Sequence, residues 1–290
     1  MKPLAGRLRR RERLLADGAI GTMLIARGLP PGEPPERWTI ERPHAVEAVA
    51  RAYADAGADL LTTNTFGASP LRLRAHGLED RLDEINNRGV QLARDASDGR
   101  AYVLASIGPT GHLLKPLGDV DAQTVLDGFR RQAAALAAAG ADAICIETMT
   151  DAVEAVLAIE AVKAEAPGLP VFATMTFDLT PRGPFTVMGV DVPRACSRLQ
   201  EAGADLVGAN CGAGAEAMLA VAREFSRATT LPLIFQPNAG LPEHQEGRLV
   251  YPQPPAAFAS QVAPLLEIAT VIGGCCGTTP AHIAALRAML

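Results

Sequence analysis

The chain has 290 residues, of which 48% are hydrophobic and 20% charged, with 27 glycines and 22 prolines. This is the composition of an ordinary globular protein and excludes a disordered or collagen-like chain. Its 27 lysines and arginines stand against 32 aspartates and glutamates, a net charge of -5. The chain therefore lacks the basic excess that favours nucleic-acid binding, and we expect no nucleic-acid partner.

The N-terminal segment, residues 1–13, is rich in arginine but does not resemble a targeting signal. No apolar segment with a cleavage site follows it, because the next apolar run, 14–20, has the pattern of a core strand. No stretch of the chain approaches the roughly 18 apolar residues that a membrane span needs. We therefore expect a cytoplasmic protein with no membrane part, in which 1–13 is a basic extension or a short helix.

Eight apolar, strand-like runs recur along the chain, and an amphipathic helical pattern follows each of them. The predicted strands cover 14–20, 59–64, 102–107, 142–147, 171–177, 205–210, 233–236 and 270–273. The predicted helices lie near 43–56, 80–96, 122–139, 151–165, 192–202, 214–228, 255–267 and 280–289. Three of these helices end in Ala-Gly-Ala-Asp, where Gly57, Gly140 and Gly203 are expected to provide a left-handed C-cap.

Strands that alternate with helices form a parallel sheet. Eight such units in a chain of this length favour an α/β fold of the closed (β/α)8 kind, a TIM barrel, over an open doubly wound sheet. No Gly-x-Gly-x-x-Gly motif follows the first strand, which argues against a dinucleotide-binding fold. No break in composition marks a linker, so the sequence predicts one domain over residues 1–290.

In a barrel of this kind the active site lies at the carboxyl ends of the strands and in the loops after them. Two of these loops, 179–190 and 240–254, are longer than usual. We expect them to shape the entrance of the site.

Three of the five cysteines follow predicted strands six and eight, which we expect to face one another across part of the rim: Cys211, Cys275 and Cys276. Zinc binds thiolates in tetrahedral geometry, and three protein ligands with an open fourth position are typical of a reactive site. The spacing matches no zinc finger, so this prediction depends on the barrel. The alternative is free thiols, which is what we expect of Cys145 and Cys196, inside a strand and a helix.

Motifs at the strand ends carry a resemblance that spans essentially the whole chain. They are Asp17-Gly18-Ala19-Ile20-Gly21-Thr22, Asn64-Thr65-Phe66, Gly108-Pro109-Thr110-Gly111, Asn210-Cys211, Pro237-Asn238-Ala239-Gly240 and Gly273-Gly274-Cys275-Cys276-Gly277-Thr278-Thr279-Pro280. With these motifs the sequence resembles the homocysteine S-methyltransferase family. Within that family it is most similar to the homocysteine-binding domain of cobalamin-dependent methionine synthase, notably in 115–119 and in the Cys-Cys segment up to His282. The resemblance implies a zinc barrel that converts homocysteine to methionine, with Cys211, Cys275 and Cys276 as the zinc ligands.

Glu147 and Asp17 are the candidates for binding the ammonium group of homocysteine. Both lie at strand ends on the predicted rim, where an unpaired carboxylate is costly and an ammonium partner offsets that cost. The resemblance favours Glu147. The alternative for either residue is a salt bridge to an arginine or a hydrogen bond from a backbone N–H.

For the substrate carboxylate and for Asn238, the sequence allows two alternatives each. The substrate carboxylate is expected to bind either to backbone N–H groups of 18–22 or to Asn64, Thr65 and Phe66. Asn238 belongs to the Pro-Asn-Ala-Gly motif. Its amide oxygen is expected either to coordinate zinc while substrate is absent or to form a hydrogen bond with loop backbone.

The methyl donor is expected to come from outside the chain, because one barrel fills all 290 residues. The resemblance favours methylcobalamin, free or presented by a cobalamin- or folate-binding partner protein, with S-methylmethionine and S-adenosylmethionine as alternatives. Betaine is the least favoured donor, since the chain has few aromatic residues for a cage around a quaternary ammonium. The rival to an enzyme is a non-catalytic barrel that binds a thiol or zinc.

Overall fold

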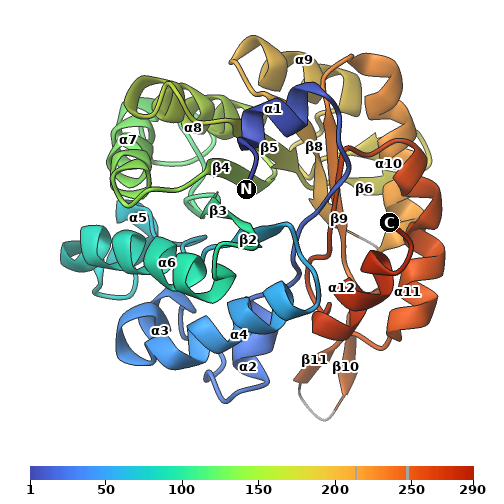
Figure 1. The fold of residues 1–290 in the computed structure, drawn as a ribbon. Coiled ribbons are helices and arrows are strands. Elements are labelled where there is room, and N and C mark those ends of the chain that lie inside the picture. The colour runs from blue at the N-terminus through green and yellow to red at the C-terminus, as the bar shows by residue number, and fades with distance from the viewer. Residues whose placement is uncertain (213, 246–247) are drawn as a thin grey trace.

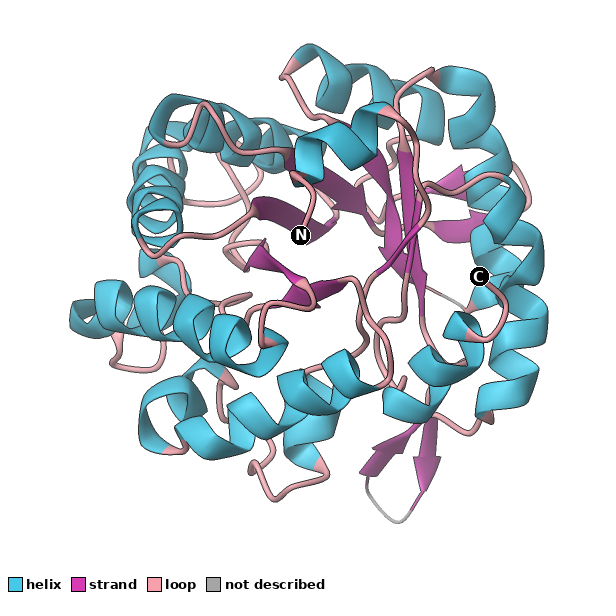
Figure 2. Ribbon diagram, in the orientation of Figure 1, coloured by secondary structure: helices cyan, strands magenta, loops and turns pink. Residues whose placement is uncertain are grey.

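The computed structural model describes residues 1–212, 214–245 and 248–290. A parallel sheet of eight strands lies at its centre, and helices surround the sheet (Figures 1 and 2). The strands are β1 (Leu14–Leu15), β2 (Leu60–Thr62), β3 (Tyr102–Ile107), β4 (Ala143–Met149), β5 (Val171–Met175), β8 (Leu206–Cys211), β9 (Leu233–Pro237) and β12 (Val271–Ile272). Their order in the sheet is β1-β12-β9-β8-β5-β4-β3-β2.

The two ends of this sheet meet between β1 and β2. Ala16 forms a parallel bridge with Leu60, and the N–H of Asp59 donates to the carbonyl oxygen of Leu15 over 2.7 Å. The N–H of Asp17 donates to the carbonyl oxygen of Leu60 over 3.0 Å. The predicted single-domain (β/α)8 barrel is therefore confirmed.

The eight predicted helices are present, with ends that differ by a few residues. They are α4 (Pro43–Asp55), α6 (Leu82–Ser97), α7 (Ala122–Ala138), α8 (Ala152–Glu165), α9 (Val192–Glu201), α10 (Ala215–Ala228), α11 (Pro255–Val262) and α12 (Pro280–Arg287). The three predicted C-cap glycines, Gly57, Gly140 and Gly203, have φ angles of 93°, 87° and 100°, which is the left-handed conformation expected there. No helix of the described residues is long and apolar enough to cross a membrane.

Short elements occupy segments for which the sequence predicted a strand or a loop. The first predicted strand, 14–20, ends early: residues 17–19 are irregular, and helix α2 (Gly21–Ile25) begins directly after a bend at Ile20. Helices α3 (Glu36–Glu41) and α5 (Pro70–Arg74) lie on the same rim, and a 3-10 turn (Glu79–Arg81) precedes α6.

Each of the two long loops contains a hairpin that was not predicted from the sequence. In the first, β6 (Asp178–Thr180) pairs with β7 (Gly183–Phe185). In the second, β10 (Glu243–Gln245) pairs with β11 (Arg248–Val250). Strands of three residues are too short to show a clear alternation of apolar and polar residues, so the sequence pattern misses them.

Helix α1 (Leu4–Arg9) covers one end of the barrel (Figure 1). Its Leu4 and Leu8 pack against the inward side chains of the strands, among them Leu60, Tyr102 and Phe172. Because successive strand residues face opposite sides, the outward residues of the same strands pack against the helices in a second, larger core. Strands that are apolar on both faces are typical of parallel sheets covered by helices.

Candidate active site

The inward side chains of the barrel change from apolar to polar near the carboxyl ends of the strands. On β3 and β4 the inward positions run from Leu104 to Ser106 and from Cys145 to Glu147, as the period of two requires. Ser106 and Glu147 line a cavity of about 540 Å³, together with Gln236 of β9. The barrel core therefore ends in a polar floor at the face where barrels of this kind bind ligands.

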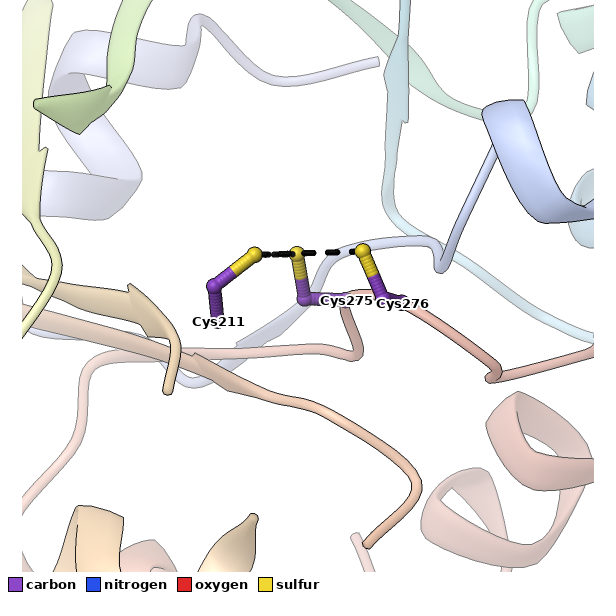
Figure 3. A group of neighbouring side chains, drawn as sticks. All are labelled: Cys211, Cys275 and Cys276. Carbon is purple, nitrogen blue, oxygen red and sulfur yellow. Dashed lines mark hydrogen bonds between the residues drawn. The ribbon is translucent and has the colours of Figure 1, made fainter. Parts of the chain in front are cut away.

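Three cysteine side chains converge at this cavity (Figure 3). Cys211 ends β8, and Cys275 and Cys276 follow β12. The Sγ atom of Cys211 lies 2.9 Å from that of Cys275 and 3.9 Å from that of Cys276. The three sulfur atoms all lie within 4.8 Å of one another. The strands that carry the thiols do not face one another across the rim, as was expected from the sequence. Only β9 lies between β8 and β12, so the thiols come from one side of the rim.

The spacing and chemistry of the three thiols fit a zinc ion. With Zn–S bonds of about 2.3 Å, sulfur atoms at the corners of a tetrahedron lie about 3.8 Å apart. The separation of 3.9 Å between Cys211 and Cys276 agrees with this value, and the 2.9 Å separation from Cys275 would have to lengthen. Hydrogen bonds from Cys211 and Cys275 lower the pKa of Cys276 to about 3. A lowered thiol pKa favours the thiolate form, which is the form that binds zinc.

The remaining two cysteines lie elsewhere and do not belong to this group. Cys145 is on β4 and Cys196 on α9, and each is only 1% exposed. Burial raises the pKa of both thiols. Thiols of this kind pack as small apolar side chains.

The loop that carries Cys275 is held by the start of α12. The hydroxyl of Thr278 donates to the carbonyl oxygen of Cys275 over 2.7 Å and accepts from the N–H of Ala19 over 3.1 Å. Thr279 is the N-cap of α12 and forms a capping box with His282. The segment Thr278-Thr279-Pro280 therefore fixes the thiol loop between the first strand and the last helix.

Asn238 lies beside the same loop. Its Nδ2 donates to the carbonyl oxygen of Gly212 over 2.7 Å. Its Oδ1 is buried and has no hydrogen-bond partner among the described residues. A buried amide oxygen without a partner is costly, so this atom is suited to accept a bond from a ligand or to approach a cation.

Glu147 offers a carboxyl group without a cationic partner. Ser106 donates a short hydrogen bond to Oε1, and the Nδ2 of Asn210 lies 3.5 Å from Oε2. Within the described part of the chain no arginine or lysine forms an ion pair with it. Burial raises the pKa of Glu147 from an ordinary 4.5 to about 7. A cationic ligand group at this position would stabilise the carboxylate.

Asp17 has a different environment, although burial also raises its pKa to about 7. Its Oδ2 accepts from the N–H of Thr62 and its Oδ1 from the hydroxyl of Thr62, both over 2.7 Å. Its side chain is 1% exposed, and it is not among the residues that line the cavity. Asp17 therefore links β1 to β2 where the barrel closes. Its hydrogen bond from the backbone N–H of Thr62 is one of the alternatives to ammonium binding that the sequence left open.

The three residues after β2 differ in their access to the cavity. Asn64 and Phe66 line it, and Thr65 does not. Asn64 donates from Nδ2 to the carbonyl oxygen of Pro35 over 2.7 Å, and Thr65 donates to the carbonyl oxygen of Ser106 over 2.8 Å. These two side chains already have partners within the protein. Residues 18–22 also line the cavity.

Sequence reasoning missed several residues that line the cavity. Ser106 and Gln236 could have been found, because each follows an apolar inward residue at a distance of two along its strand. Arg72 and His76 lie on and just after α5. This helix was not predicted, so no sequence signal pointed to them.

Comparisons with known proteins agree with this architecture. Residues 14–290 match the model of a family described as homocysteine S-methyltransferase. The methionine synthases of Mycobacterium tuberculosis and Mycobacterium leprae are 33% and 32% identical to this chain over 93% of its length. The chain spans about a quarter of those relatives, 24% in both cases.

A solved structure similar over its whole length is the metallated form of the homocysteine methyltransferase MmuM from Escherichia coli. It is 27% identical, with a TM-score of 0.80 and full coverage of both chains. A carboxyl transferase domain of Rhizobium etli pyruvate carboxylase, 16% identical with a TM-score of 0.53, shares the fold.

Proposed function

Because the chain belongs to the homocysteine S-methyltransferase family, we propose that it methylates homocysteine to methionine and that Cys211, Cys275 and Cys276 hold the zinc ion this reaction uses. The observation that carries the proposal is the convergence of three sulfur atoms within 4.8 Å of one another, in the same cavity as an unpaired carboxyl group. A thiol has an ordinary pKa near 8.5, and zinc bound at the three cysteines supplies the positive charge that keeps a substrate thiol deprotonated at neutral pH.

The residues of the chain divide the recognition of homocysteine between them. Glu147 binds the substrate ammonium, since it has no cationic partner in the described protein and lines the same cavity as the thiols. Asn210 lies between Glu147 and the thiols. Its side chain is fixed by Thr148: its Nδ2 donates to the hydroxyl of Thr148 over 2.7 Å, and its Oδ1 accepts from the N–H of Thr148 over 2.8 Å. The ammonium and the thiol of one small amino acid are thereby bound by groups on β4, on β8 and in the loop after β12, which all lie at the same rim of the barrel.

The contact for the substrate carboxylate is proposed for the backbone of 18–22. This segment lines the cavity, whereas the polar side chains of Asn64 and Thr65 already have partners in the protein. Asn238 is proposed as a fourth group for zinc while substrate is absent, because its Oδ1 is buried without a partner.

Methylcobalamin is the proposed methyl donor, and the support for it is the similarity to proteins named methionine synthase. A small sulfonium donor such as S-methylmethionine or S-adenosylmethionine is the second candidate, and the size of the cavity favours it. Cavities of about 300–1,000 Å³ hold drug-sized ligands, and homocysteine alone is much smaller than such a ligand. At about 540 Å³, the cavity has room for a second reactant.

The experiment that tests the proposal is methionine formation by the zinc-loaded protein. Homocysteine would be supplied with methylcobalamin, S-methylmethionine, S-adenosylmethionine and betaine in parallel. The proposal predicts methionine from at least one donor, with methylcobalamin, free or on a partner protein, the most effective. Zinc binding without turnover on any of them would favour a non-catalytic thiol- or zinc-binding barrel.

A further inference from the structure

A cationic side chain that lines the cavity is left without a hydrogen-bond or ion-pair partner in the described structure. It is Arg72 of α5. Within the described ranges, no residue forms a hydrogen bond or an ion pair with its guanidinium group. Arginine side chains beside a cavity usually pair with carboxylates or phosphates. An arginine that lines a ligand cavity without such a partner therefore points to an anionic ligand group.

Two glycines make room for this side chain. A Cβ atom at Gly67 would lie 3.2 Å from Arg72 Cγ, and one at Gly111 would lie 2.7 Å from Arg72 Nη1. Gly67 belongs to the loop after β2 and Gly111 to the loop after β3, so the arginine extends from one loop to the next. The absence of a side chain at these two positions leaves space for Arg72 between the loops.

No carboxyl group among the described cavity residues forms an ion pair with the arginine. Glu33 and Glu36 also line the cavity, but neither forms an ion pair with Arg72 in the described structure. Glu36 is 3% exposed, and its Oε1 accepts from the N–H of Gly67 over 2.6 Å. Burial raises the pKa of Glu36, and the charge of Arg72 lowers it in part, so the two groups attract each other without forming an ion pair. Glu33 is exposed to solvent, where water screens its charge.

Arg72 is also separate from the proposed homocysteine site. The substrate ammonium and carboxylate are attached to one carbon atom, so both must bind close to Glu147. No cation of the described residues lies near enough to Glu147 to pair with it or to lower its pKa. The anion that Arg72 would bind therefore belongs to a second ligand in the same cavity.

Resting on the proposed function, we propose that Arg72 anchors the methyl donor by an anionic oxygen group and so selects donors that carry one. Two sources share this chemistry: the carboxylate of an amino-acid sulfonium donor bound inside the cavity, and the phosphodiester of a cobalamin bound over its mouth. In both cases the guanidinium group holds the donor at one end while its methyl group faces the thiol end.

The test compares Arg72→Gln with Arg74→Gln in the zinc-loaded protein. Arg74 lies on the same helix, but its side chain is 62% exposed and pairs with Glu79, which makes it a matched control. Four donors distinguish a carboxylate from a phosphodiester as the bound anion. They are S-methylmethionine, the carboxylate-free trimethylsulfonium ion, methylcobalamin, and methylcobinamide, which lacks the phosphodiester-linked nucleotide. Donor binding is measured by calorimetry and donor KM by methionine formation.

If the anion is a carboxylate, Arg72→Gln weakens S-methylmethionine about 10- to 100-fold, the usual range for a charged hydrogen bond, and leaves trimethylsulfonium unchanged. If it is a phosphodiester, the same loss occurs with methylcobalamin and not with methylcobinamide. Homocysteine affinity stays normal in both cases.

Equal donor binding by Arg72→Gln and Arg74→Gln would overturn the inference. So would a loss of homocysteine affinity in Arg72→Gln, or a parent protein that binds no anionic donor. If the parent binds such a donor but forms no methionine from any of them, the proposed function fails, and the calorimetric comparison still decides the role of Arg72.

Discussion

The Nδ2 atom of Asn210 lies 3.5 Å from Oε2 of Glu147. The same nitrogen lies 3.8 Å from the Sγ of Cys275, so a single amide group separates the carboxyl group from the thiols. A small amino acid with a thiol at one end and an ammonium at the other fits this arrangement. The two halves of the proposed substrate site are therefore one structural unit.

The first prediction concerns the charge of Glu147. Glu147→Gln keeps the shape of the side chain and removes the partner of the substrate ammonium, so homocysteine should bind more weakly by about 1.5–3 kcal/mol. Zinc content should stay normal. Calorimetry with the zinc-loaded protein measures the affinity, and Glu160→Gln, an exposed residue on the next helix, serves as control. Unaltered affinity in Glu147→Gln would remove this residue from the site.

The second prediction concerns the pH dependence of stability. Burial raises the pKa of Glu147 from 4.5 to about 7, so the folded protein binds a proton that the unfolded chain releases. The resulting stabilisation is fully present below pH 4.5 and is lost as the pH rises through about 7. The free energy of unfolding of the zinc-free protein, from urea titrations, should fall over this range. Glu147→Gln should show a smaller fall, and an identical one would contradict the assignment.

The third prediction concerns the pH dependence of binding of methionine, a ligand without the substrate thiol. Methionine has no ionisable thiol, so the pH dependence of its binding reports on the protein carboxyl group. Because the ammonium pairs with the charged form of Glu147, methionine affinity should increase as the pH rises through about 7. Fluorescence or calorimetric titration measures it. Affinity that is constant with pH would show that the carboxyl group is not in contact with the ammonium.

The fourth prediction distinguishes Asp17 from Glu147. Asp17 accepts two hydrogen bonds from Thr62 at the closure of the barrel, so Asp17→Asn should lower the free energy of unfolding by about 1–3 kcal/mol. It should change homocysteine affinity less than Glu147→Gln does. A stable variant with strongly weakened homocysteine binding would place Asp17 in the substrate site after all.

The fifth prediction concerns the cysteines. Alanine at Cys211, Cys275 or Cys276 should abolish stoichiometric zinc, whereas alanine at the buried Cys145 or Cys196 should leave zinc in place. Metal analysis of the purified variants measures this. The barrel core does not depend on one ion, as a zinc finger does, so far-ultraviolet circular dichroism should be unchanged after chelation. Unfolding on chelation would contradict this view of the fold.

Much of the fold could be predicted from the sequence because parallel strands are buried on both faces and appear as continuous apolar runs. The same reasoning placed Cys211, Cys275 and Cys276 at one end of the barrel, since all strands of such a sheet end at the same rim. The order β12-β9-β8, which sets the thiols on one side, is the chain order of the last three barrel strands. It follows from the predicted barrel, because consecutive strands of such a barrel lie side by side.

Contacts between side chains that are distant in sequence could not be predicted. Asp17 and Glu147 look alike at the ends of their strands. Only the structure shows that Asp17 accepts two hydrogen bonds from Thr62 outside the cavity, whereas Glu147 lines the cavity. Arg72 lies on a helix of five residues, which is too short to give a helical period. Whether its guanidinium group has a partner depends on the loops around it, and the sequence pattern does not show how these loops lie.

The measurement that tests the central claim most directly is X-ray absorption at the zinc edge, with and without homocysteine. Without substrate, the account predicts three sulfur neighbours and one oxygen or nitrogen neighbour around zinc. With homocysteine, it predicts four sulfur neighbours, because the substrate thiolate joins Cys211, Cys275 and Cys276. A zinc environment that keeps three sulfur atoms at saturating homocysteine would contradict the claim that this site activates the substrate thiol.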